Sequence, residues 1–279
     1  MIESLALVER KTTGWDERIR SFNASDLVDL YTIATKNFLI VFDTGNAPEQ
    51  MQDLMSLIES DLKGRQLLVI NSHRHFDHTW GNALFTLDSA YPAPIISHEK
   101  SVKLLREKPE EALAFLHEQQ EKSPFLNNVK IISPTLTFSE KFTIYAGDLT
   151  LELFPTPGHS SDHISVWIPE IKTLLAADTA EHPIPYAAPD GSIRQLEQDL
   201  QLLKSFGATI VLPCHGGTIE PALIDRNLHY FKTLREKINL AAFDQSLEPE
   251  HVPEAMGWTF EMAMHDLGLT GDFGEFYQG

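Results

Sequence analysis

Three histidines and an aspartate occupy four of six consecutive positions, His73-Arg74-His75-Phe76-Asp77-His78, in a chain of 279 residues with 12 histidines. The apolar run "LLVI" precedes them and predicts a short buried strand that leads directly into the cluster. Imidazole binds zinc and iron well, and a carboxylate adds negative charge and can join two ions. We therefore interpret this segment as part of a metal site rather than as a purely structural cluster.

Three more potential ligands follow apolar strands elsewhere in the chain: His159 after "LELFPTPG", Asp178 after "TLLAA" and His215 after "TIVLPC". Taken alone, each has an ordinary explanation, such as a hydrogen-bonding loop histidine or an aspartate that caps a helix. In open α/β sheets, however, ligands bind beyond the carboxyl ends of the strands. We expect the seven residues to converge there: His73, His75, Asp77, His78, His159, Asp178 and His215.

The number of ligands indicates two metal ions. Seven side chains are too many for one four-coordinate zinc, but they suit a pair of ions about 3.5–4 Å apart, as in two-metal hydrolases. Such a pair can lower the pKa of a bound water and polarise a substrate oxygen. We predict two divalent ions, zinc in the first place, with iron or manganese as alternatives because His/Asp sets accept all three.

Hydrophobic periodicity predicts alternating strands and helices, and hence a layered α/β protein. Residues 31–45 read as one strand followed by a turn, residues 48–62 as a helix and residues 65–73 as a buried strand. Later segments predict helices over 98–122, broken at Pro109, over 194–206, and over a long amphipathic stretch from Ile224 to Ile238. Short strands fill residues 129–178 and begin with "VKIISP" at 129–134.

Composition narrows the possible partners. Hydrophobic residues make up 42% of the chain and the net charge is −18, which is typical of a globular protein that repels nucleic acid. We expect a small-molecule substrate and no nucleic-acid or membrane partner, because no apolar run approaches the roughly 18 residues of a membrane span. The sequence does not specify an oligomeric state.

Cys214 is the only cysteine, so an intramolecular disulfide is impossible. The first residues lack a basic segment followed by an apolar one, which leads us to expect a cytoplasmic protein. We further expect residues 1–279 to form a single domain with a C-terminal helical extension from about residue 220.

The motifs resemble, in the same order, those of the metallo-β-lactamase superfamily: His73-x-His75-x-Asp77-His78, then "PGH" at His159, "AAD" at Asp178 and "CHGG" at His215. The resemblance implies a four-layer αββα sandwich of two mixed β-sheets flanked by helices, with the site at one edge. It implies that His73, His75 and His159 bind one metal, that Asp77, His78 and His215 bind the other, and that Asp178 bridges them. Asp43, in "VFDTG", resembles an acidic residue that supports the site from behind.

Within the superfamily, an aspartate at the bridging position is similar to the glyoxalase II-like and lactonase-like hydrolases and differs from antibiotic-degrading enzymes. The short gaps between His159, Asp178 and His215 leave no room for the inserted domain of the nucleic-acid-processing branch. The resemblance thus implies hydrolysis of a small ester, thioester or lactone, with Asp77 as the catalytic residue that orients the attacking hydroxide or accepts a proton.

Two alternatives remain open. One is a mononuclear non-haem iron dioxygenase acting on a persulfide, which would use only two histidines and a carboxylate. The other is a metal-binding protein without catalysis.

Several further residues are secondary candidates. His163 is a possible support for the ligands, and His182 and Tyr186 lie on a loop that we expect to face the pocket. We interpret Cys214 as a buried, inert thiol and Phe76 and Trp80 as packing residues.

Overall fold

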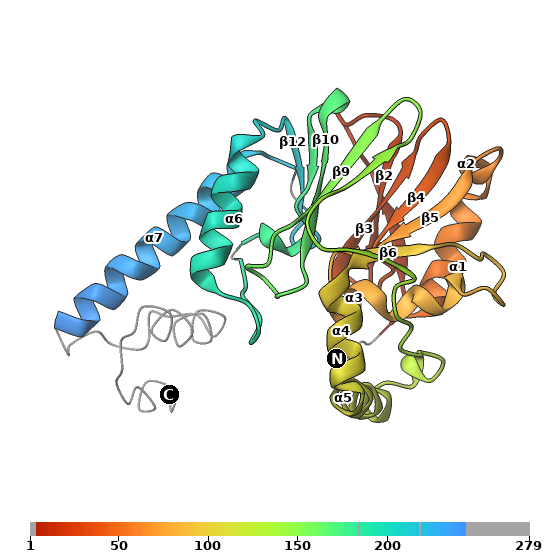
Figure 1. Cartoon of the computed structure of the whole chain (residues 1–279), viewed down its shortest axis with the longest axis horizontal. Helices are drawn as coiled ribbons and strands as arrows, with labels where there is room; N and C mark the ends of the chain where they lie inside the picture. Colours follow the sequence, from red (N-terminus) through yellow and green to blue (C-terminus); the bar gives the residue numbers. More distant parts are fainter. Residues whose placement is uncertain (1–3, 184, 218, 244–279) are drawn as a thin grey trace.

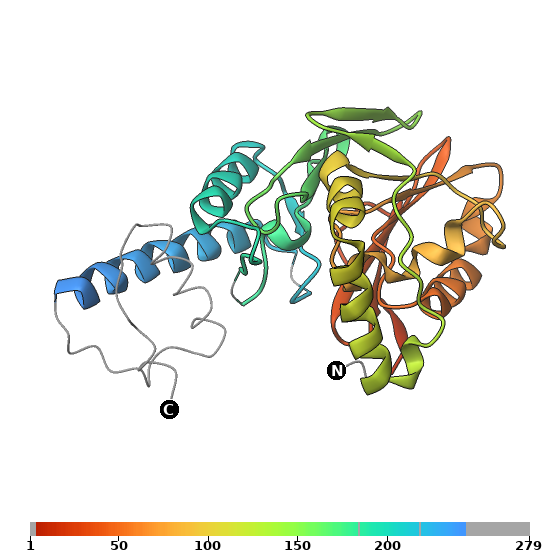
Figure 2. The same cartoon turned by 60° about the horizontal axis from the view of Figure 1, so that its bottom comes forward.

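Two β-sheets pack face to face at the centre of the chain, and helices cover their outer faces (Figures 1 and 2). The structure is a computed structural model that describes residues 4–183, 185–217 and 219–243. Apolar side chains from the inner faces of both sheets, such as Phe22, Ile40, Leu153 and Val166, are fully buried in one continuous cluster. Their burial drives the pairing of the sheets, and the result is the four-layer αββα sandwich that the sequence predicted.

The first sheet has seven strands in the order β1 to β7. Neighbours pair antiparallel from β1 to β4 and parallel from β4 to β7, so the sheet is mixed. Its strands are β1 Leu7–Arg10, β2 Ile19–Ala24, β3 Val28–Ala34, β4 Phe38–Phe42, β5 Gln66–Ile70, β6 Ile95–His98 and β7 Leu136–Phe138.

The second sheet has five strands in the order β12-β11-β10-β9-β8. It is also mixed, because β11 and β12 pair parallel and the other neighbours antiparallel. Its strands are β8 Phe142–Tyr145, β9 Thr150–Pro155, β10 Ile164–Ile168, β11 Thr173–Leu175 and β12 Ile210–Leu212.

The helices separate into three groups (Figure 1). The helices α1 (Pro48–Leu57) and α2 (Glu59–Leu62) cover the first sheet, α6 (Ile193–Ser205) covers the second, and α7 (Ala222–Phe243) packs against α6 and extends away from the sheets. The helices α4 (Glu99–Glu107) and α5 (Pro109–Lys122) follow β6 and project beyond the end of the sandwich. Among the described residues, no helix is long and apolar enough to cross a membrane.

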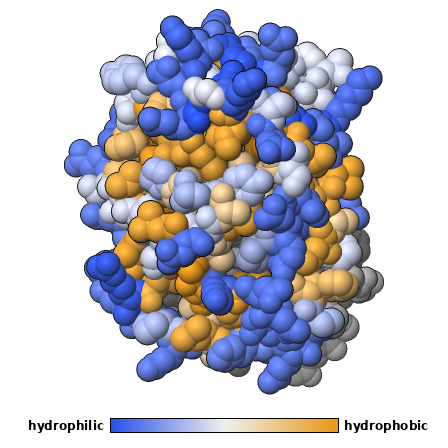
Figure 3. Space-filling view, turned by 90° about the vertical axis from the view of Figure 1, so that its right-hand side faces the viewer, coloured by the Kyte–Doolittle hydropathy of each residue, from blue (hydrophilic) through white to orange (hydrophobic). Residues whose placement is uncertain are grey.

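The surface combines charged and apolar side chains. On the face at the right of Figure 1, apolar areas lie between hydrophilic side chains that cover the rest of that face (Figure 3).

Two expectations for secondary structure were wrong. Residues 31–45 do not form one strand, because β3 and β4 pair as an antiparallel hairpin and the polar residues Lys36 and Asn37 turn the chain. The segment 129–134 forms no strand, although it is apolar. The carbonyl of Ile132 accepts a hydrogen bond from the Asn82 side chain at 3.2 Å instead of pairing with a neighbouring strand.

The other expected elements are present, but some bounds differ: β5 ends at Ile70 rather than at residue 73, and α7 extends to Phe243, beyond the predicted Ile238. The predicted helix over 48–62 is interrupted at Ile58, and the helical segment 98–122 breaks at Pro109 as proposed. The amphipathic pattern from Ile224 onward lies within α7. The tail after residue 243 lies outside the described residues, so the single-domain assignment with its C-terminal extension stays a prediction.

One contact between α6 and the end of β9 fixes the chain next to His159. A Cβ on Gly158 would lie 2.2 Å from Leu196 Cα, so only glycine allows α6 to come this close. The buried Asp199 carboxylate on α6 accepts hydrogen bonds from the Gly158 amide at 2.7 Å and from the Gln195 side chain at 2.8 Å. Burial raises the pKa of Asp199 to about 6, although both hydrogen bonds lower it.

We expect this carboxyl group to make the free energy of unfolding fall as pH rises. Its pKa is higher in the folded protein, so its contribution is fully present below about pH 4 and is lost as pH rises through about 6. Compared with Asp199→Asn, which keeps an acceptor but cannot ionise, the wild type should lose at most about 3 kcal/mol over this range. Urea unfolding of both metal-free proteins at several pH values measures the difference, and parallel pH profiles would contradict the assignment.

Candidate metal centre

The loop after β5 carries four of the seven expected ligands. After Ile70 the chain continues through Asn71 and Ser72 to His73, and His75 immediately precedes the single-turn helix α3 (Phe76–Thr79). The Asn71 side chain and the Thr44 amide both donate to the carbonyl of His78, at 3.1 and 2.9 Å. These two hydrogen bonds fix the backbone of the segment that carries the expected ligands.

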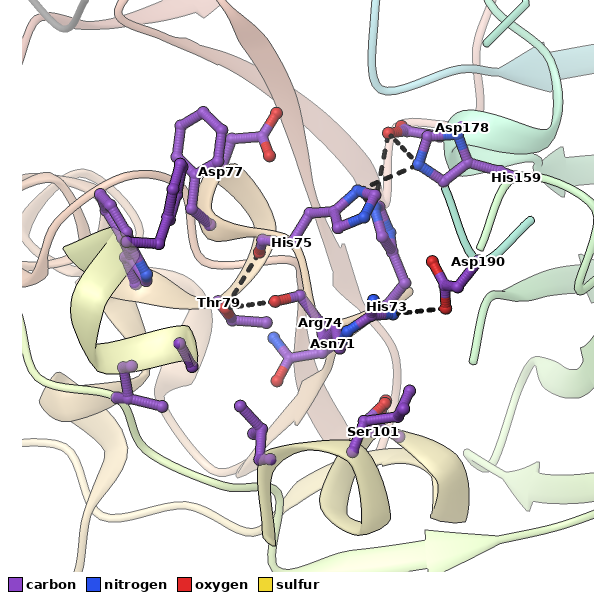
Figure 4. A pocket seen from close by; sticks show the side chains of 18 of the residues that line it. Asn71, His73, Arg74, His75, Asp77, Thr79, Ser101, His159, Asp178 and Asp190 are labelled. Carbon is purple, nitrogen blue, oxygen red and sulfur yellow. Dashed lines mark hydrogen bonds and ion pairs between the residues drawn. The ribbon is translucent and has the colours of Figure 1, made fainter. Parts of the chain in front are cut away.

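The first group of ligand atoms combines this loop with two other strand ends. His73, His75, His159 and Asp178 each offer an atom, and these atoms lie within 4.8 Å of one another. His75 Nδ1 is 2.8 Å from His73 Nε2 and 3.1 Å from His159 Nε2. Figure 4 shows these side chains pointing toward one another at the wall of a pocket.

The second group consists of Asp77, His78 and His215, whose ligand atoms also lie within 4.8 Å of one another. Asp77 Oδ2 is 3.5 Å from His78 Nε2 and 3.4 Å from His215 Nε2. The loop after β12 brings His215 to this point, since Cys214 and His215 follow the strand directly.

One carboxylate oxygen, Asp178 Oδ2, lies between the two groups. It is 3.6 Å from His73 Nε2 and 3.5 Å from His159 Nε2 in the first group. It is 3.2 Å from His78 Nε2 and 3.4 Å from His215 Nε2 in the second group. The structure thus brings all seven expected residues together, and their division between two metal ions, which the family resemblance implied, stays a prediction.

The far nitrogen of four imidazoles is held by an oxygen, which determines which nitrogen faces the centre. A histidine whose Nδ1–H donates to such an oxygen keeps the lone pair of its Nε2 directed inward. The Nδ1 contacts are His73 with Ser72 Oγ at 2.9 Å, His78 with Asp43 Oδ2 at 2.9 Å, His159 with the Tyr186 carbonyl at 2.7 Å and His215 with the Leu27 carbonyl at 2.8 Å.

Asp43 and His163 support the ligands, as the sequence indicated. Asp43 also accepts hydrogen bonds from the Ser72 amide at 2.7 Å and the Ser72 hydroxyl at 2.8 Å, so it fixes the start of the histidine loop. His163 Nε2 accepts a hydrogen bond from the Asp178 amide at 3.1 Å. Asp43 and Ala177, next to Asp178, both have the left-handed backbone that non-glycine residues rarely adopt, with φ of 62° and 45°.

Burial and charge divide the histidines into two kinds. Burial lowers the pKa of His73 and His159, which favours their neutral, metal-binding form. Burial alone would also lower the pKa of His78, but the charges of Asp178, Asp77 and Asp43 raise it well above its ordinary value. The carboxylates therefore draw positive charge to the second group of ligands.

The residues fit a metal pair on two observations of the structure itself. Within the described part of the chain, His78 Nε2 and Asp178 Oδ1 are buried without a hydrogen-bond partner, although buried polar atoms are normally satisfied. Four imidazole nitrogens also surround a single carboxylate oxygen, an arrangement that a cation on either side of Asp178 would explain.

A buried polar network that the sequence did not reveal connects the histidine loop to α4. The Asp162 carboxylate is completely buried and accepts from the Arg74 amide at 2.9 Å, from Arg74 Nη1 at 2.8 Å and from the Ser101 hydroxyl of α4 at 2.7 Å. Arg74 Nη1 also contacts Asp190 Oδ2 at 3.0 Å. Arg74 had no assigned role in the sequence, because only the fold brings its partners to it.

Glu181 was also missed. Its Oε1 lies 3.6 Å from His159 Nδ1, it lines the pocket, and burial together with the charge of Asp178 raises its pKa well above the ordinary value. Its position directly after "DTA" was the available signal. Of the two loop residues named instead, Tyr186 lines the pocket, whereas His182 is exposed and does not belong to the pocket lining among the described residues.

Cys214, Phe76 and Trp80 are packed as the sequence predicted, and the two aromatic rings also line the pocket. Cys214 is buried, and its thiol donates to Asp43 Oδ2 at 3.5 Å. Burial raises its pKa, which keeps the thiol protonated. The Phe76 and Trp80 rings pack at 5.1 Å.

Comparison with known proteins agrees with this geometry. The family model described as the metallo-beta-lactamase superfamily matches residues 26–215. A beta-lactamase-like protein 2 homolog of Caenorhabditis elegans is 26% identical over 75% of this chain and 64% of its own length. A hydroxyacylglutathione hydrolase of Idiomarina loihiensis is 26% identical over 71% and 65%, and the human acyl-coenzyme A thioesterase MBLAC2 is 24% identical over 71% and 76%. The chain thus spans just under two thirds of the first two relatives.

Solved structures share the fold. A metallo-beta-lactamase from Pontibacter korlensis superposes with a TM-score of 0.63 at 20% identity, over 81% of this chain and 99% of that one. The DIM-1 metallo-beta-lactamase has a TM-score of 0.61 at 18% identity, over 81% and 97%. With the family model covering most of the strands and every expected ligand, the chain belongs to the metallo-β-lactamase superfamily.

Proposed function

We propose that the protein is a hydrolase that holds two divalent metal ions and cleaves a small ester, thioester or lactone. The observation that carries the proposal is the position of Asp178 Oδ2, which lies 3.2–3.6 Å from imidazole nitrogens of both ligand groups. His73, His75 and His159 would hold one ion, and Asp77, His78 and His215 the other, with Asp178 shared. When bound, such a pair supplies a water nucleophile at neutral pH and a Lewis acid for the substrate carbonyl.

The protein's own residues position the reaction and handle the proton. Asp77 lines the pocket and contacts His78 and His215 through Oδ2. From this position the Asp77 carboxylate would orient a water in the pocket and accept a proton from it. Burial would raise the pKa of Asp77, but the positive charges of His78 and His215 beside it lower it, so the carboxylate is ionised as a base must be.

The names of two relatives support this choice of substrates. One relative is described as a hydroxyacylglutathione hydrolase and another as an acyl-coenzyme A thioesterase. The iron dioxygenase alternative needs only two histidines and one carboxylate, whereas seven His and Asp side chains, Asp178 among them, gather at this site.

We expect the purified protein to contain about two metal ions per chain. Asp178→Asn removes the charge shared by the two groups and should reduce the metal content to about one ion or less. The matched control is Asp53→Asn on the exposed face of α1, which should retain the wild-type content. Elemental analysis after purification without chelators measures all three proteins, and a wild type devoid of metal would remove the basis of the proposal.

Asp77→Ala should lower kcat for a panel of esters, thioesters and lactones by about 100-fold or more, the usual contribution of a positioned base. Because Asp77 is also a proposed ligand, metal content is measured on the same samples. Full turnover by the variant would rule out the role of Asp77, and oxygen consumption with a persulfide by a wild type inert to the panel would favour the dioxygenase.

Metal binding should release protons at neutral pH. The carboxylates hold the pKa of His78 well above its ordinary value, and a protonated imidazole must lose its proton to bind a metal. The apparent affinity for Zn²⁺ should therefore fall by about tenfold per pH unit, for each proton released, as pH is lowered. Calorimetry in buffers of different ionisation enthalpy counts the protons, and equal heats in all buffers would exclude the release.

A further inference from the structure

The pocket extends well beyond the metal ligands. It has a volume of about 640 Å³, within the range of small-molecule sites. His75, Asp77 and His159 form one end, and α4 and α5 form the other. In Figure 4, α4 with Ser101 lies on the side of the pocket opposite Asp178 and His159.

The α4–α5 end is lined by apolar side chains that the hydrophobic core does not use. Leu104 and Leu105 of α4 are half-buried and line the pocket, as do Ala112 and Phe115 of α5. Their neighbour Leu116 instead packs into a small core cluster and is only 3% exposed. Leu116 thus anchors α5 and leaves Phe115, which is 42% exposed, on the pocket side.

An aromatic wall joins this apolar end to the metal end. The Phe115 ring lies 5.8 Å from Phe76 and 5.9 Å from Trp80, and Phe76 and Trp80 lie 5.1 Å apart. Phe76 stands between His75 and Asp77 in the sequence. In a molecule bound at the metal ligands, the atoms next to the bound group would therefore contact this aromatic wall.

The charges near the apolar end largely compensate each other. Lys108 and Glu111, at the corner between α4 and α5, pair at 3.1 Å. Arg74, on the other side, is engaged by Asp162 and Asp190. This end therefore suits an uncharged group better than an anionic one, because an anion would have to displace a carboxylate from its partner.

We propose that the α4–α5 end binds an apolar substituent of the substrate, aliphatic or aromatic, and so selects substrates with a longer carbon chain over acetyl compounds. The proposal rests on the proposed function of the adjacent metal site. The substituent belongs to the acyl group or to the leaving group, which are distinguished by substrates extended on one side only. Burial of each methylene contributes about 0.8 kcal/mol, which corresponds to up to about fourfold in kcat/KM.

The test uses two series with the metal-replete protein: acetyl to octanoyl thioesters of one thiol, and acetate esters of alcohols of increasing length. In one of the two, kcat/KM should rise by about two- to fourfold per methylene. Ala112→Phe fills the pocket and should cost the longest substrate about tenfold or more while leaving the acetyl compound within about twofold. The matched control, Ala114→Phe, lies on an exposed position of the same helix outside the pocket lining and should keep the wild-type series.

Measuring the binding of octanoate tests the apolar subsite without requiring that the protein turn over a substrate. Calorimetric titration with octanoate should show binding to the wild type and to Ala114→Phe, and weaker binding to Ala112→Phe. Phe115→Ala, which removes a partly exposed ring, should also weaken it.

The two proposals fail in different ways. Suppose that the acetyl compounds are hydrolysed, that kcat/KM does not change with chain length in either series, and that octanoate binds Ala112→Phe and Ala114→Phe equally. That result would overturn the apolar subsite and leave the hydrolase intact. Octanoate binding that Ala112→Phe weakens, with no hydrolysis of any substrate, would support the subsite and overturn the hydrolase.

Discussion

The electrostatic attraction between buried carboxylates and the groups around them governs this structure. Asp43, Asp77 and Asp178 are almost entirely buried at one edge of the sandwich, where isolated negative charges would be strongly unfavourable. Imidazoles surround them, and four of these are oriented by oxygens on their far side. The strands supply the rigidity that this requires, since each ligand follows the end of a buried strand. Two strained backbone positions, Asp43 and Ala177, lie where the chain must turn sharply to present these groups.

The sequence was sufficient to predict which seven side chains the fold brings together, because each combines two independent signals, a metal-binding residue type and a position at the end of an apolar strand. It was also sufficient for the sandwich, through the order of strands and helices and the family motifs. It was insufficient where function depends on contacts between distant segments. Arg74 looked like a spacer because its partners, Asp162 and Asp190, are 88 and 116 positions away. For Glu181 the only signal was its position three residues after Asp178, and the packing of its loop against His159 is what places it at the site.

The errors in secondary structure have a similar origin. Periodicity identifies apolar segments, yet whether such a segment pairs depends on a free sheet edge nearby. The segment 129–134 is apolar because it covers the pocket and the small core below α5, where Ile131 packs and Ile132 lines the wall. For the apolar residues of α4 and α5, the sequence likewise does not show whether a side chain packs in the core or lines the pocket. Leu116 belongs to the core and Phe115 to the pocket, and adjacent positions on a helix give no indication of this difference until the neighbouring elements are placed.

The Asp162 network has a consequence for how this protein could acquire a new specificity. Through Ser101 and Arg74, one carboxylate joins the helix that lines the pocket to the loop that carries the histidines. A displacement of α4 would therefore be transmitted to His73 and His75 through the three short hydrogen bonds that Asp162 accepts from Ser101 and Arg74. Transplanting α4 and α5 from another protein would therefore disturb the metal loop unless the serine at the start of α4 came with them. The hydrogen bonds of the Asp162 network described above do not involve α5. Substitutions confined to α5 can therefore change the shape of the pocket without disturbing the loop that carries the histidines.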